Sequence, residues 1–179
     1  MMRDNQRVKF VMVGDDARKS VLERAAKGAG LRNVEFIGHR HPSTMSDVLA
    51  AGDLHLIPLA AGAAGCLVPS KVYGILAAGR PFVAMMESDA EVARLASEFE
   101  VGFVVPPGDA HALARTISDS MRSRARLDDM GRRARVLAEQ QYDRRLVTRR
   151  FAEFLKTMVP VREEAVPLPI ESVVTTQIK

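Results

Sequence analysis

The sequence is poor in cysteine and aromatic residues, and it has no long hydrophobic run. Among its 179 residues there is one cysteine, Cys66, and no tryptophan. A single cysteine excludes an internal disulfide, and nothing else in the chain argues for an oxidising compartment. No stretch approaches about 18 consecutive apolar residues, which excludes a membrane-spanning helix. The polar start, residues 1–6, lacks the apolar core of a secretory signal, so we predict a cytoplasmic protein.

The positive charge is concentrated in one segment. The chain is 47% hydrophobic and 27% charged, as in a single folded domain, and its net charge is +4. Between Arg115 and Arg150 there are eleven arginines and five acidic residues. With one aromatic residue, Tyr142, this segment lacks the aromatic interleaving of single-strand binding, and we predict no nucleic-acid partner. We interpret it as solvated helix faces, with peripheral binding to an anionic inner membrane surface as the alternative.

Short apolar runs alternate with amphipathic stretches along most of the chain. The runs at 8–13, 33–37, 54–57, 81–85 and 102–105 each end at glycine, proline or a turn, and some are apolar on both faces. This is typical of parallel strands covered on both sides. We predict an α/β fold, a doubly wound and mostly parallel open sheet of about five strands, with C-terminal helices at 127–140 and 144–158.

The helices between the strands have recognisable starts, and the domain has a predicted end. Asp89 and Asp109 are each placed to cap a helix that follows them. We expect one domain over residues 1–159, because the periodicity stops there, and a disordered tail over 160–179.

The strongest candidate site is a glycine-rich loop, Ala60–Lys71, that follows a strand and runs into a helix. Ligands of doubly wound folds bind beyond the carboxyl ends of the strands. Exposed N–H groups, the Ser70 hydroxyl and the Lys71 ammonium are donors suited to a phosphate or diphosphate, and Gly62 and Gly65 permit close backbone approach. The alternative is a plain flexible loop, because the spacing of a P-loop is absent.

The other candidate binding residues have weaker sequence signals. The loop at Gly14 has one glycine where a dinucleotide fingerprint needs three, which favours an ordinary turn. Glu91 is placed to bind sugar or ribose hydroxyls, or simply to stabilise the first turn of a helix. His39 and His41 lack further ligands nearby, so we predict no metal site, and we interpret Cys66 as a small packed residue. No catalytic residue can be assigned.

One block of sequence points to a known family. The block Val68–Pro81, VPSKVYGILAAGRP, is supported by residues 10–15, 33–38, 50–58, 88–94 and 102–109. Together they resemble the C-terminal, donor-binding half of a GT-B glycosyltransferase, specifically the family 4 retaining enzymes of bacterial polysaccharide assembly. The resemblance covers roughly residues 8–157 and implies that a Rossmann-like domain holds the nucleotide of a nucleotide-sugar, UDP-linked, as substrate and without a resident cofactor. It implies transfer of the sugar to a polysaccharide or lipid-linked acceptor.

The resemblance also implies where the donor binds. The base would lie near Gly38, and the diphosphate would lie over the glycine-rich loop and the helix that opens at Ser70 and Lys71. Many family members carry a pair of glutamates for binding ribose or sugar hydroxyls, at positions that hold Cys66 and Gly74 here. Because this chain has neither glutamate, Glu91 is the nearest residue that could bind those hydroxyls instead.

The chain departs from the family pattern in length. The N-terminal acceptor domain and the first strand–helix unit of the donor domain have no counterpart in it, and we interpret it as a truncated product or one half of a split enzyme. We expect it to be inactive alone, and to self-associate or to need a partner chain. Two other functions stay open, a nucleotide-sugar 2-epimerase and a non-catalytic nucleotide-sugar-binding module.

Overall fold

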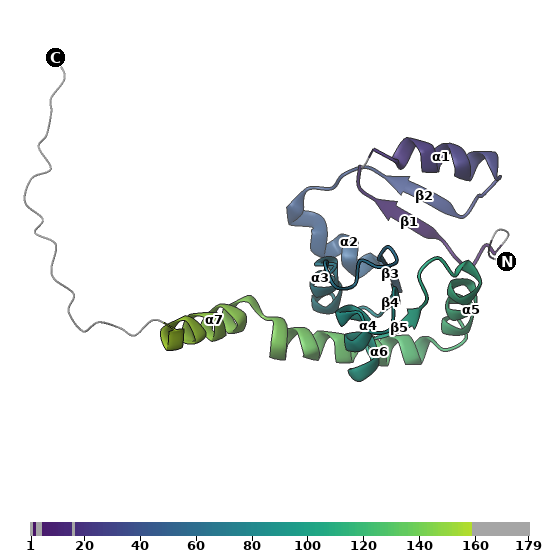
Figure 1. Cartoon of the computed structure of the whole chain (residues 1–179). Helices are drawn as coiled ribbons and strands as arrows, with labels where there is room; N and C mark the ends of the chain where they lie inside the picture. The colour runs from purple at the N-terminus through teal and green to yellow at the C-terminus, as the bar shows by residue number, and fades with distance from the viewer. Residues whose placement is uncertain (1, 3–4, 16, 159–179) are drawn as a thin grey trace, which may run out of the picture. The chain divides into compact units, whose positions relative to one another are not determined.

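The computed structural model describes residues 2, 5–15 and 17–158. Each strand predicted from the sequence is present, within two residues of its expected bounds (Figure 1). The elements run in the order β1 Phe10–Val13, α1 Lys19–Gly28, β2 Val34–Ile37, η1 Pro42–Thr44, α2 Met45–Ala51, β3 His55–Pro58, α3 Lys71–Ala77, β4 Phe82–Met85, α4 Glu91–Glu98, β5 Gly102–Val105, α5 Ala110–Ser120, α6 Arg124–Leu137, η2 Ala138–Tyr142 and α7 Arg144–Met158.

All strand pairs of the described residues are parallel, which confirms the predicted α/β class. Phe10 of β1 pairs with Val34 of β2, and His55 of β3 pairs with Phe82 of β4. β4 in turn pairs with β5. The arrangement differs from the expected single sheet, because the strands form a two-stranded sheet, β1–β2, and a three-stranded sheet, β3–β4–β5. Among the described residues, β1 and β3 therefore each keep one edge without a ladder partner.

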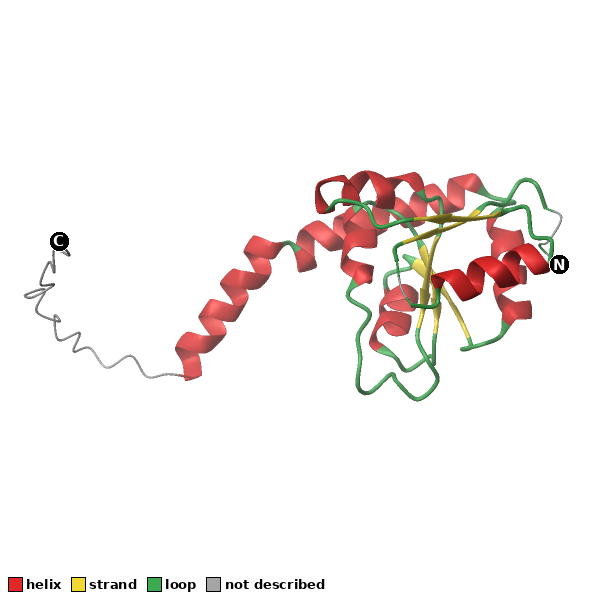
Figure 2. Ribbon diagram, turned by 90° about the horizontal axis from the view of Figure 1, so that it is seen from above, coloured by secondary structure: helices red, strands yellow, loops and turns green. Residues whose placement is uncertain are grey.

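The hydrophobic core lies around the three-stranded sheet. Its most buried large side chains come from β3, α3, β4 and the residue after it, α4 and the turn before β5: Ile57, Val72, Ile75, Leu76, Phe82, Val83, Met86, Val92 and Val101. In Figure 1, α3 and α5 flank these strands on opposite sides, and Figure 2 shows helices on both sides of them. By contrast, no residue of β1, α1, β2 or α2 is buried. Val21 of α1 is 52% exposed.

The predicted helix starts are correct at one aspartate and wrong at the other. Asp109 is the N-cap of α5, and its carboxylate accepts a hydrogen bond from the N–H of Ala112 at 2.8 Å. Asp89 is not a cap, because α4 begins one residue later with Ala90 as its N-cap and no side-chain hydrogen bond. The face of α4 that carries Val92 and Leu95 is buried.

The first of the two C-terminal helices begins three residues earlier than predicted, whereas the second begins at Arg144 as predicted, and the chain divides between them. α6 begins at Arg124 and continues into η2, a short π-helical stretch. Two compact units are distinguished, Met1–Asp143 and Arg144–Lys179, and the described part of the second consists of α7. The predicted tail, 160–179, lies outside the described residues. None of the described helices is long and apolar enough to cross a membrane.

Candidate functional site

The first candidate loops follow β1 and β2, and one aspartate joins them. Asp15 accepts hydrogen bonds from the N–H of His39 and from the Lys19 ammonium, both at 2.6 Å. The hydrogen bond from Lys19 has the larger effect, and together the two hold the pKa of Asp15 below its usual range. Gly14 has a φ of +132°, and a Cβ added to Gly38 would stand 3.4 Å from the Asp15 carboxylate. Asp15 therefore brings together the loops of Gly14 and Gly38, a contact between distant segments that sequence reasoning missed.

The glycine-rich loop is tied to the loop after β4. The N–H of Gly62 donates a hydrogen bond to Oε1 of Glu87 at 2.8 Å. Gly62 has a φ of +77°, the left-handed conformation in which other residues are strained. Open space surrounds the position that a Cβ would take at Gly62 or Gly65, so the backbone here is accessible to a ligand. Glu87 is the second residue that sequence reasoning missed.

Ser70 and Lys71 lie exposed where α3 begins. Ser70 is the N-cap residue, yet its hydroxyl makes no capping hydrogen bond, and Lys71 is the first helical residue. Several N–H groups of the loop are already used within the protein, those of Gly62, Ala63, Cys66 and Leu67. The donors that this segment offers an anion are therefore chiefly the two exposed side chains, rather than the wider backbone cradle expected from the sequence. The interpretation of Cys66 as a packed residue is wrong, because Cys66 is exposed.

Glu91 lies beside a pair of tyrosines. The rings of Tyr73, from α3, and Tyr142, from η2, are 5.0 Å apart between centroids and tilted by 48°. Partial burial raises the pKa of both phenols, and the Glu91 carboxylate raises each further. Both hydroxyls therefore stay protonated at neutral pH and can donate hydrogen bonds. The sequence held no signal for this pair, because its two members lie far apart in the chain.

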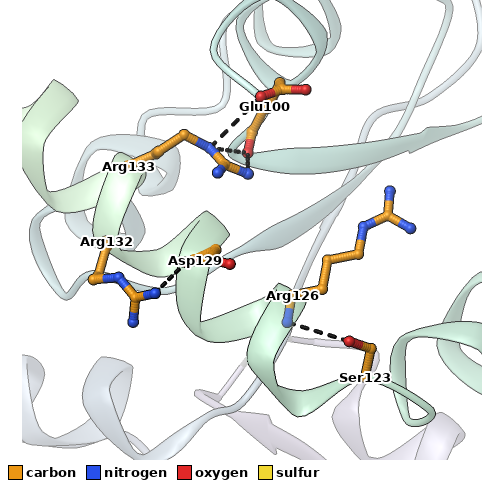
Figure 3. Close-up of polar contacts among 6 residues, drawn as sticks. All are labelled: Glu100, Ser123, Arg126, Asp129, Arg132 and Arg133. Carbon is orange, nitrogen blue, oxygen red and sulfur yellow. Dashed lines mark hydrogen bonds and ion pairs between the residues drawn. The ribbon is translucent and has the colours of Figure 1, made fainter.

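The arginines of α6 mostly contact other parts of the protein. Figure 3 shows Arg133 donating to the carbonyl oxygen of Glu100, at 2.9 and 3.0 Å, and Arg132 beside Asp129. The guanidinium of Arg126 lies 5.3 Å from the centroid of the Phe103 ring. Arg133 and Arg126 thus hold α6 against the rest of the domain, a role that the charge pattern alone did not reveal, whereas the contact of Arg132 stays within α6.

A cavity lies at the opposite end of the three-stranded sheet. Its volume is about 310 Å³, and it is lined by Asp53, Arg80 and Arg124 among others, next to the amino ends of β3 and β4. Arg124 pairs there with Asp53 at 2.7 Å, and Arg80 donates to the carbonyl oxygen of Ala50 at 2.5 Å. Because its cations already have partners and the candidate loops lie at the other strand ends, we assign it no ligand.

Residues 1–123 match the family model described as "Glycosyl transferases group 1". The chain belongs to this family. It is 30% identical over 155 residues to the probable glycosyltransferase WbjE of Pseudomonas aeruginosa, a match that spans 87% of the chain and 38% of WbjE. It is 32% identical over 143 residues to the putative colanic acid biosynthesis glycosyl transferase WcaI of Escherichia coli K12, across 79% of the chain and 34% of WcaI. The chain thus spans little more than a third of these relatives.

Solved structures confirm the fold expected from the resemblance. Anabaena Alr3699/HepE in complex with UDP aligns with a TM-score of 0.70 and 22% identity, over 85% of the chain and 42% of HepE. Sucrose-phosphate synthase of Thermosynechococcus elongatus aligns with a TM-score of 0.70 and 18% identity, over 83% of the chain and 38% of the synthase. This group 1 glycosyl transferase chain therefore has the fold of about two fifths of each of these solved chains.

Proposed function

We propose that this chain binds the nucleoside diphosphate of a UDP-sugar, and that the whole enzyme transfers the sugar to a polysaccharide or lipid-linked acceptor on the cytoplasmic side of the membrane. One observation carries the proposal: the candidate residues of this family member gather in loops at the carboxyl ends of parallel strands, where doubly wound folds bind nucleotides. HepE, a structural relative, binds UDP and UDP-glucose in its solved structures, which supports the choice of nucleotide.

Different candidate residues would bind different parts of the nucleotide-sugar. Ser70 and Lys71 would hold the diphosphate, because both are exposed donors at the start of α3. Gly62 and Gly65 would let the phosphates approach the backbone. The loops at Gly14 and Gly38 would lie by the base. Glu91, with the two tyrosine hydroxyls beside it, would bind ribose or sugar hydroxyls.

The described chain would form one wall of the active cleft, and an acceptor domain or partner chain would form the other. The unpaired edges of β1 and β3 support this reading. A single strand placed between them would restore the order 3-2-1-4-5-6 of a doubly wound sheet, in which the described residues supply every strand except strand 1. We therefore propose that a strand–helix unit outside these 179 residues pairs with both edges.

Calorimetry with UDP and UDP-glucose tests the proposal. We expect the 179-residue chain to bind UDP and to show no turnover of UDP-glucose, because one wall of the cleft is provided by another segment. Adenosine diphosphate is the matched control for the base. Failure to bind any uridine nucleotide would remove the proposed function. Binding that is followed by turnover with an acceptor would show that the chain is a complete transferase.

We expect the isolated chain to self-associate through apolar surface rather than through charge. Val11, Met12 and Val13 of β1 are between 41% and 48% exposed, and apolar patches of this kind drive association. Light scattering should detect association that persists or strengthens when salt is raised to about 1 M, where attraction between charges is screened. Met12→Lys should reduce the association, while Val136→Lys, at a residue of similar exposure on α6, should not. A chain that stays monomeric at every salt concentration would contradict this.

A further inference from the structure

Glu87 lies just beyond the carboxyl end of the central strand of the three-stranded sheet, next to the glycine-rich loop. β4 ends at Met85, opposite Pro58 of β3. The ladder continues for one more step, because the N–H of Leu59 donates to the carbonyl oxygen of Met85 at 3.1 Å. Glu87 follows two residues later, and its side chain is the one that receives the N–H of Gly62. Its carboxylate therefore lies between the glycine-rich loop after β3 and the loop that opens α4.

The two oxygens of this carboxylate differ in their surroundings. Oε1 accepts the hydrogen bond from Gly62, whereas Oε2 is buried from solvent and has no hydrogen-bond partner among the described residues. The pKa of Glu87 lies below its usual range, chiefly because the carboxylate accepts the hydrogen bond from the Gly62 N–H. The carboxylate is therefore ionised at neutral pH. An ionised carboxylate oxygen that is withdrawn from water and lacks a donor is unfavourable, and it is relieved when a ligand supplies the donor.

We infer that Oε2 of Glu87 accepts a hydrogen bond from a hydroxyl group of the nucleotide-sugar. The acceptor-only character of a carboxylate excludes a phosphate as its partner and selects a ligand group that donates. A sugar hydroxyl and a ribose hydroxyl share this chemistry. The inference rests on the proposed donor site, and it assigns Glu87 part of the role that the family gives to glutamates at the positions of Cys66 and Gly74. Glu91 is exposed, so its oxygens are open to water, and any contact that Glu91 makes with ligand hydroxyls is additional to that of Glu87.

Binding measurements on Glu87→Gln isolate this role. Glutamine keeps an acceptor for the Gly62 N–H but replaces one carboxylate oxygen by an amide. For the wild type and the variant, calorimetry gives the Kd of UDP-glucose, UDP and 2′,3′-dideoxy-UDP. We expect the variant to bind UDP-glucose at least fivefold more weakly, with dideoxy-UDP unaffected. Loss on UDP-glucose alone assigns the hydroxyl to the sugar, and an equal loss on UDP assigns it to the ribose. Glu98→Gln, at the exposed far end of α4, should change none of the three.

The outcomes separate this inference from the function on which it rests. An equal loss for all three ligands would mean that Glu87 only braces the loop, and it would overturn the inference while leaving the donor site standing. If Glu87→Gln binds UDP-glucose as tightly as the wild type does, the inference is likewise overturned and the donor site still stands. A wild-type chain that binds none of the three would remove the donor site and this inference together.

Discussion

Gly131→Ala is expected to destabilise the domain by about 2–3 kcal/mol, through the overpacking of a close contact between two helical regions. Gly131 lies in α6, where it is buried against the turn that ends α3. A Cβ added at this position would overlap the carbonyl oxygen of Gly79. Gly79 cannot easily move, because its φ of +65° and the following Pro81 fix the entry into β4. The backbones must therefore separate, and the packing of α6 on α3 is lost.

The sign of this effect is informative, because helix propensity alone predicts the opposite. Replacing glycine by alanine inside a helix normally stabilises it by about 0.8–1 kcal/mol. Thermal unfolding should show a fall in Tm of roughly 5–10 °C for Gly131→Ala. Gly28→Ala is the matched control, since Gly28 ends α1 and a Cβ there meets nothing within 4 Å. A Tm for Gly131→Ala at or above that of the wild type would show that α6 does not pack in this way.

The parts of the fold that the sequence predicts best are those whose signals are local. The strands β4 and β5 are short apolar runs ended by a turn or by proline, and Asp109 is an N-cap beside an apolar repeat. Asp89 failed as a cap for an equally local reason, because the turn from Glu87 to Ala90 uses the Glu87 carbonyl and shifts the helix start by one residue. Such shifts depend on backbone geometry that the residue types alone do not specify.

The parts that could not be predicted depend on contacts between distant segments. The separation of β1–β2 from β3–β4–β5 is a property of strand pairing, and the alternation of apolar runs is the same for one sheet or two. The bond between Gly62 and Glu87 and the pairing of Tyr73 with Tyr142 likewise join residues far apart in the chain. The sequence marked the glycine-rich loop as the candidate site, but the carboxylate that holds it comes from another strand end.

Lys71 is the residue of the candidate site whose replacement should weaken nucleotide binding most. Its side chain is exposed at the start of α3, and among the described residues no carboxylate lies within ion-pair distance of it. Its charge is therefore available to a diphosphate, and binding need not first break an ion pair within the described protein.

Lys71→Ala should reduce the affinity for UDP by about 1.5–3 kcal/mol, the range for a hydrogen bond to a charged group. Each 1.4 kcal/mol is about a tenfold change in Kd, so calorimetry resolves the effect readily. Lys71→Arg should retain much of the affinity for UDP because it keeps the positive charge. The difference in UDP affinity between the wild type and Lys71→Ala should become smaller at high salt, because salt screens that charge. Lys27→Ala, at an exposed lysine in the last turn of α1, should bind UDP like the wild type. If Lys71→Ala and Lys27→Ala bind UDP equally well, the diphosphate does not lie at the start of α3, and the proposed placement of the donor phosphates is wrong.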